Sequence, residues 1–298
     1  MNKRGLAFVF FGAVLWGTTG TSQALAPEGA GSLAIGALRL LVGGLALLGI
    51  MLARRSQARQ GTSPRLPLGA VIGAAACMAA YQVLFFAGVA RTGVAVGTIV
   101  GIGSSPILAG ALGFLFRGER PGWRWAAATF LAVLGCALLL LAGAEIRLDG
   151  GGIALAIGAG AAYSTFSLVS KQMLDRHPVE TVMAVVFSLG AVMLSPLLFT
   201  QRIDWAFTPR GAAVILHLGL LATALAYLLY GRGLALLPLS TAVTLSLAEP
   251  LTAGILGVAL LGEKMTALSF AGVALIFSGL VVLAARRPAA AGSLEPTP

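Results

Sequence analysis

GTIVGIGSSPILAGALGFLFRGERPGWRWAAATFLAVLGCALLLL, residues 97–141, returns 144 residues later as TAVTLSLAEPLTAGILGVALLGEKMTALSFAGVALIFSGLVVLAA, residues 241–285. The positions that match are a proline, a Gly-Glu pair and small residues: Pro106 with Pro250, Ala109 with Ala253, Gly110 with Gly254, Gly113 with Gly257, Gly118-Glu119 with Gly262-Glu263, and Gly135 with Gly279. A duplication of this kind in an apolar chain is typical of two related halves around a central site. We therefore expect two repeats, residues 1–144 and 150–287.

Composition indicates a membrane protein. Hydrophobic residues make up 58% of the chain and charged residues 10%, against roughly 25% charged in soluble domains. Apolar runs of about 20 residues, long enough to cross a bilayer as helices, occur ten times: 5–25, 32–53, 68–90, 94–116, 123–143, 151–173, 181–200, 211–231, 239–261 and 267–285. The runs are apolar all round, which excludes the alternation of a barrel strand. The sequence predicts an all-α membrane protein with ten transmembrane helices, five in each half.

Basic residues set the expected orientation, because Lys and Arg gather in short cytoplasmic loops. With the N-terminus inside, fourteen Lys and Arg residues fall on the cytoplasmic side and five outside (Arg91, Arg147, Arg202, Arg210 and Lys264). Five helices per half then make the halves an inverted-topology pair with both termini cytoplasmic. Topology also accounts for the formal charge of +10, so no nucleic-acid partner is expected. The expected location is the inner membrane of a bacterium, in contact with its lipid bilayer.

The two ends of the chain carry separate predictions. Lys3, Arg4, the following apolar run and Ala24-Leu25-Ala26 could be read as a cleaved signal peptide. The apolar run is longer than a signal core, and its removal would leave the first half one helix short, so a retained first helix is favoured. Residues 288–298 are expected to be a disordered tail.

Polar and aromatic side chains cluster on a few of the apolar runs, and such groups are costly in hydrocarbon unless they face the protein interior. Such a lining suits an amphipathic small solute. Each hydroxyl could instead bond its own backbone or a neighbouring helix. The candidate cavity residues are Trp16, Thr19, Tyr81, Gln82, Phe85, Tyr163, Ser164, Phe166, Tyr227, Tyr230, Ser246 and Glu249.

Prolines and glycines mark candidate hinges in the two copies of the repeated pattern. Pro106 and Pro250 each remove a backbone hydrogen bond, and Gly97 and Gly101 loosen the first copy. A static kink that only shapes packing is the alternative.

Two charges lie inside apolar runs. Glu249, beside Pro250, is expected to be neutral when desolvated. It could exchange protons with a gradient, hold a substrate ammonium group, or cap the backbone broken by Pro250, and its counterpart in the first copy is Ser105. Arg39 is expected to be an anchor or to form an interhelical ion pair rather than to touch substrate.

These features resemble a known family. The duplicated pattern, Leu15-Trp16-Gly17-Thr18 and Arg39 are similar to the drug/metabolite transporter superfamily, in its ten-helix EamA-type branch. Within the branch the chain looks most like YddG-type amino-acid exporters. The resemblance covers residues 5 to 285 and implies a basket of helices 1, 3, 4, 6, 8 and 9 around a cavity, alternating access, and substrates that include aromatic amino acids.

Enzyme signatures are missing from the sequence. It contains no Walker phosphate loop, HExxH or GxSxG motif, and Asp149, Asp175 and Asp204 fall in predicted loops. Cys77 and Cys136 have no metal-ligand spacing, so neither a metal nor a cofactor is expected. The sequence thus favours a non-enzymatic secondary carrier, expected as a monomer, and the resemblance implies that it exports amino acids and similar metabolites. An efflux carrier for other amphipathic or cationic compounds and a passive pore are the alternatives.

Overall fold

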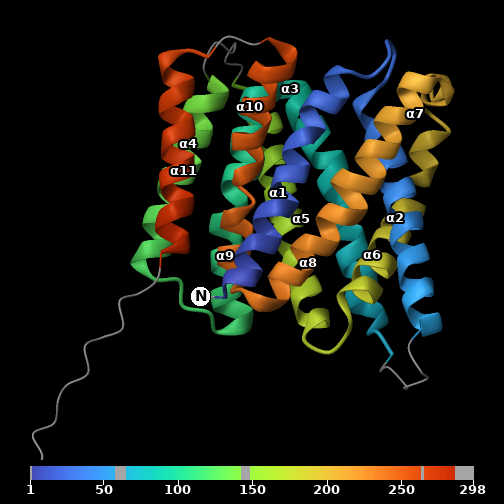
Figure 1. Cartoon of the computed structure of the whole chain (residues 1–298), viewed down its shortest axis with the longest axis horizontal. Helices are drawn as coiled ribbons and strands as arrows, with labels where there is room; N and C mark the ends of the chain where they lie inside the picture. The colour runs from blue at the N-terminus through green and yellow to red at the C-terminus, as the bar shows by residue number, and fades with distance from the viewer. Residues whose placement is uncertain (1, 58–64, 142–147, 263–264, 286–298) are drawn as a thin grey trace, which may run out of the picture.

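A computed structural model describes residues 2–57, 65–141, 148–262 and 265–285, and these residues are helical with short connections (Figure 1). The predicted tail, Glu263, Lys264 and the join between the halves at 142–147 lie outside the described residues. The helices, in chain order, are α1 (Lys3–Ala24), α2 (Ser32–Gln57), α3 (Leu68–Arg117), α4 (Trp123–Leu141), α5 (Gly150–Leu174), α6 (Val179–Leu198), η1 (Asp204–Phe207), α7 (Pro209–Leu216), η2 (His217–Leu225), α8 (Ala226–Leu236), α9 (Leu239–Leu245), α10 (Ala248–Leu261) and α11 (Ala267–Ala284).

The described part of the chain has nine helices long and apolar enough to cross a membrane, where ten were expected. The predicted runs 68–90 and 94–116 belong to one element, α3. Its single non-helical residue is Gly93, at φ 81° and ψ 163°. A Cβ on Gly97 would lie 2.8 Å from the Val89 side chain, although eight residues of straight helix span about 12 Å. The chain therefore reverses at Gly93, and α3 consists of two antiparallel arms.

Helical structure is also interrupted in the second half. The segment from α7 to α8 passes through the π-helical stretch η2, and the predicted helix 239–261 is divided at Ser246-Leu247 into α9 and α10. Pro250 thus falls in the first turn of α10, where a missing N–H costs no helical bond. Pro106, by contrast, lies inside the continuous second arm of α3. The two matched prolines therefore occupy different local structures.

Helices of the first half pack against helices of the second half. In Figure 1, α4 lies beside α11, and α1 lies beside α8 and α10; α2 also packs on α6, and α3 on α5. The two Gly-Glu turns start alike: Gly118 (φ 63°) and Gly262 (φ 71°) are left-handed caps that bond back to the carbonyls of Gly113 and Gly257. Glycine is favoured there because a Cβ is strained at positive φ.

The contact between α4 and α11 is reciprocal. A Cβ on Gly135 would lie 2.6 Å from the Gly272 carbonyl oxygen, and a Cβ on Gly279 would lie 2.7 Å from the Ala128 carbonyl oxygen. Residues 128 and 272 occupy the same position in the two copies of the repeated pattern. The matched glycines therefore serve one purpose, which is to let two antiparallel helices approach closely.

Replacing Gly135 by alanine is expected to lower the free energy of unfolding by about 1 to 3 kcal/mol, because the new methyl group meets backbone rather than a movable side chain. The same change at Gly73, where nothing lies within 4 Å of the new Cβ, is the matched control and should be neutral or slightly stabilising. Denaturant unfolding of both variants in detergent measures the difference. Equal stability of the two variants would show that the α4–α11 contact does not require glycine.

Candidate functional site

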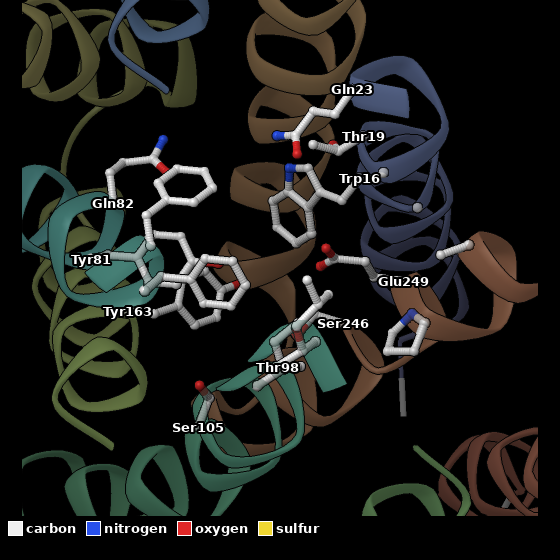
Figure 2. Close-up of a pocket in the computed structure, with 18 of the residues that line it drawn as sticks. Trp16, Thr19, Gln23, Tyr81, Gln82, Thr98, Ser105, Tyr163, Ser246 and Glu249 are labelled. Atoms are coloured by element: carbon white, nitrogen blue, oxygen red, sulfur yellow. The ribbon is translucent and has the colours of Figure 1, made fainter. Parts of the chain in front are cut away.

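A cavity of about 240 Å³ lies among helices of both halves (Figure 2). We call it the central cavity. Its wall combines aromatic rings, small polar groups and two charges. It is lined by Trp16, Gly17, Thr19, Gly20 and Gln23 of α1; Arg39 of α2; Tyr81, Gln82, Phe85, Phe86, Val94, Thr98, Ile102 and Ser105 of α3; Leu140 of α4; Tyr163 of α5; Tyr227 of α8; Ser246 between α9 and α10; and Glu249, Pro250 and Ala253 of α10.

Nine of the twelve cavity candidates from the sequence lie on this wall, and Ser164, Phe166 and Tyr230 do not. Ser164 is fully buried and donates to the carbonyls of Ser105 and Gly160, as the alternative for single hydroxyls expected. The other two residues belong to the layer behind the wall. Phe166 packs on Phe187 and Tyr227, and Tyr230 is fully buried with its hydroxyl 2.8 Å from that of Ser167.

The aromatic wall is continuous across four helices. The ring centroid of Trp16 lies 4.8 Å from that of Tyr227 and 6.2 Å from that of Tyr163, and Tyr81 joins Tyr163 to Phe85 at 5.7 and 5.8 Å. These separations are those of favourable aromatic pairs. Figure 2 shows Tyr81, Gln82 and Tyr163 on one side of the cavity and Trp16 and Glu249 on the other. A small apolar group can therefore be held between ring faces.

Both intramembrane charges lie on the cavity wall. The Glu249 carboxylate points into the space (Figure 2), and no hydrogen bond or ion pair joins it to another described residue, so the structure does not support the backbone-capping alternative. Arg39 is 8% exposed, and its Nε has no hydrogen-bond partner. The expected anchoring pair for Arg39 is thus absent among the described residues. Ser105 and Glu249, the unmatched pair of the two copies, both line the cavity.

Two lining residues were not predicted as such from the sequence: Thr98 was not singled out, and Arg39 was expected to be an anchor or in an interhelical pair. Thr98 stands alone in an apolar run, so no pattern singles it out. For Arg39 a signal existed, because a charge inside an apolar run is costly and is usually functional. The described residues hold no group of three or more His, Cys, Asp or Glu side chains that could bind a metal ion.

The central cavity is open at one end. Gly20 and Val94 are exposed lining residues; Gly20 is near the end of α1, and Val94 follows the reversal at Gly93. We call this the Gln23 end. Trp16, Tyr163 and Tyr227 are all less than 9% exposed and form the inner wall. These exposed lining residues make the Gln23 end the expected entrance for a solute.

Polar contacts close the opposite end, which we call the Lys171 end. Nζ of the buried Lys171 donates to the carbonyls of Leu234 and Leu237 at 2.7 and 2.6 Å, which ties α5 to the end of α8. Glu119, in the turn between α3 and α4, accepts from the backbone N–H of Leu239 at 2.9 Å. These bonds hold helix ends that otherwise have unsatisfied backbone groups.

Three arginines form ion pairs at the Lys171 end. Arg117 pairs with Asp175 at 2.9 Å, and Glu180 lies 2.9 Å from Arg232 and 3.5 Å from Arg54. These pairs link the end of α3 to the end of α5, and α6 to α2 and α8.

The predicted hinge residues are packed. Gly97 and Gly101 are buried where the arms of α3 approach each other, and Gly101 lies against the Phe85 ring. Their small size is explained by packing in this state, and their role in a motion stays a prediction. Pro106 is buried within α3, and Pro250 lines the central cavity beside the break between α9 and α10.

Comparison with known proteins places the chain among transporters. The sequence profile of the EamA-like transporter family matches twice, at residues 3–141 and 150–285. An uncharacterized transporter of Bacillus subtilis, YwfM, is 47% identical over 93% of both chains. A crystal structure of another protein superimposes with a TM-score of 0.82 at 19% identity, covering 95% of this chain and 99% of the other, and supports the fold alone.

Two further relatives carry a substrate in their names. A probable terminal-alkyne amino-acid exporter of Streptantibioticus cattleyicolor is 27% identical over 91% of this chain and 90% of its own length. The threonine/homoserine exporter RhtA of Salmonella typhimurium is 36% identical over 158 residues, 51% of each chain. Both names describe amino-acid export.

Proposed function

Because the chain belongs to the EamA-like transporter family, we propose that it is a secondary carrier that exports amino acids, aromatic ones included, across a bacterial inner membrane. The observation that carries the proposal is the central cavity, where a nearly continuous aromatic wall faces two unpaired opposite charges. Aromatic rings accept an apolar side chain, and a few polar groups orient a charged end. The two relatives named as amino-acid exporters support the same substrate class.

The size, charge and closed end of the central cavity argue against the two alternatives, an efflux carrier for other amphipathic or cationic compounds and a passive pore. A volume of about 240 Å³ is below the range of roughly 300 to 1,000 Å³ typical of sites for drug-sized ligands, so a bulky amphipathic cation fits poorly. On a lone cation the repulsion by Arg39 opposes the attraction by Glu249, so the charges of the cavity do not favour one. A passive pore needs a path through both ends, and the bonds of Lys171 and Glu119 close one of them.

Alternating access follows if residues 1–144 and 150–287 act as inverted repeats. The equivalent caps at Gly118 and Gly262 and the reciprocal contacts of α4 with α11 support this proposal. In such an arrangement the packing that closes one end can be exchanged for equivalent packing at the other. The structure then corresponds to the state open at the Gln23 end.

A cysteine at Glu28, exposed between α1 and α2, is expected to react with a membrane-impermeant maleimide in intact cells. A cysteine at Gly122, exposed between α3 and α4, is expected to react only after the cells are permeabilised, because basic residues favour the cytoplasmic side. Both are introduced after Cys77 and Cys136 are replaced by alanine. The opposite labelling pattern would reverse the proposed orientation.

Transport by purified protein in liposomes tests the function. Liposomes loaded with a panel of labelled amino acids and cationic dyes are followed with and without a pH gradient. We expect saturable release of amino acids and none of the dyes. Release of the dyes alone would favour the efflux alternative and contradict the proposal.

Glu249 is the acidic side chain on the wall of the central cavity, so any proton coupling through the cavity depends on it. Replacing Glu249 by glutamine is expected to remove whatever response transport shows to an imposed pH gradient, because glutamine cannot exchange a proton. The liposome assay at matched internal and external pH is the control. A pH response that persists in the variant would exclude coupling through Glu249.

A further inference from the structure

Four side chains on the wall of the central cavity hold a polar atom with no partner although each residue is at least nine-tenths buried. The atoms are Nε1 of Trp16, Nε of Arg39, Nε2 of Gln82 and the hydroxyl of Tyr163. Buried polar groups in proteins are nearly always hydrogen-bonded. Three of these four atoms are N–H donors, so the missing partner is a group rich in acceptor oxygens.

Glu249 is an acceptor on the same wall that lacks a donor. Its carboxylate faces the same space, half-buried, and accepts no hydrogen bond from a described residue. Arg39 and Glu249 both line this cavity, yet no ion pair joins them in the described part of the chain. The cavity therefore keeps a guanidinium and a carboxyl group apart, and ionisation of the carboxyl is costly unless a cation lies beside it.

We propose that the central cavity recognises the two charged groups of a free α-amino acid, with Arg39 binding the carboxylate and Glu249 binding the ammonium group. This inference rests on the proposed function and narrows its substrate class. An arginine guanidinium matches a carboxylate through two parallel hydrogen bonds, and a carboxylate readily accepts from an ammonium group. A zwitterion satisfies both charges at once and adds no net charge to the site.

The aromatic wall then receives the side chain of the amino acid. Trp16, Tyr81 and Tyr163 line the same cavity as the two charges and offer ring faces rather than further charge. A compound with only an ammonium group leaves Arg39 unpaired and repelled. A compound with only a carboxylate leaves Glu249 unpaired and is repelled by it. Selectivity for zwitterions therefore follows from the pair and not from either residue alone.

Binding of three related compounds to purified full-length protein tests this assignment by calorimetry. The probes are L-phenylalanine, L-phenylalaninamide, which lacks the carboxylate, and 3-phenylpropanoate, which lacks the ammonium group, at a pH of about 7, below the usual pKa of an α-amino group. The unaltered protein is expected to bind L-phenylalanine roughly tenfold to a hundredfold more tightly than either analogue, the usual worth of a charged hydrogen bond.

Each variant should lose one of the two preferences. Arg39→Gln is expected to bind L-phenylalanine and L-phenylalaninamide alike but still to prefer L-phenylalanine over 3-phenylpropanoate. Glu249→Gln should show the reverse. The preference that each variant keeps shows that it is folded, and Arg39→Lys, which retains the charge, should keep part of the preference for the carboxylate. Arg202→Gln, at an exposed residue that pairs with Asp204, is the matched control and should keep both preferences.

Retention of both preferences in either single variant would overturn the assignment while leaving amino-acid export intact. An exchange of roles, in which Arg39→Gln loses the preference for the ammonium group, would also overturn it. Failure of the unaltered protein to bind any of the three probes would contradict the claim that the central cavity recognises a free amino acid. Failure of the liposome assay to show release of any amino acid would separately contradict the proposed function.

Discussion

Replacing Trp16 by alanine is expected to lower the free energy of unfolding by about 3 to 5 kcal/mol and to reduce amino-acid transport to background. The indole is 5% exposed, and its ring centroid lies 4.8 Å from that of Tyr227 and 5.2 Å from that of Tyr230. Its removal therefore leaves a hole that joins the central cavity and takes away one ring face for the substrate. Denaturant unfolding in detergent and release from liposomes measure the two effects.

Trp123 provides the matched control, because it is the same residue type at 76% exposure. Trp123→Ala is expected to change the free energy of unfolding by less than about 1 kcal/mol and to leave transport unchanged. Trp16→Phe keeps a ring but loses the Nε1 donor, so it should retain most of the stability. Active transport by Trp16→Ala at normal stability would show that the aromatic wall does not form the binding site.

Replacing Lys171 by methionine is expected to open the Lys171 end of the molecule. Methionine fills a similar volume but cannot donate to the carbonyls of Leu234 and Leu237, which then remain unpaired. Loss of two charge-assisted bonds shifts the balance between the two access states by enough to change their populations at least tenfold. The expected result is a greater population of the state open at this end.

A cysteine at Ser170 reports this change, because the residue is fully buried and its hydroxyl has no partner that a thiol would lose. In the protein without Cys77 and Cys136, its modification by a water-soluble maleimide should be at least tenfold faster with Lys171→Met. Arg176→Met, at an exposed cation beyond the end of α5, should not change the rate. An unchanged rate in a folded Lys171→Met protein would remove Lys171 from the closure of this end.

Apolar periodicity predicted where the helices lie but not how they are joined. The run around Gly93 is apolar on both sides, so a connection of three residues was expected where the structure needs only one glycine at positive φ. Pro250 was expected to disturb the turn before it, and the break between α9 and α10 lies in that turn, at Ser246-Leu247. At the matched Pro106 the helix continues, so the proline alone does not decide where a helix breaks.

Only the part of the cavity wall made of polar or aromatic side chains in apolar runs could be predicted from the sequence. Trp16, Gln82 and Glu249 are out of place in hydrocarbon and were assigned to the interior, where they line the central cavity. Tyr230 has the same character but finds its partner in Ser167, in the layer behind the wall. Sequence alone cannot separate a polar group that is satisfied by protein from one that awaits a ligand, because the difference depends on which helices meet.

Counterflow in liposomes tests most directly whether this protein is a carrier of amino acids. Liposomes containing the protein are loaded with unlabelled L-phenylalanine at high concentration and diluted into a trace of labelled L-phenylalanine. A cavity that opens to one side at a time predicts that the label accumulates transiently above its equilibrium level, and that Trp16→Ala shows no accumulation. Entry of label that never exceeds equilibrium and rises linearly with concentration would contradict the account and identify a pore.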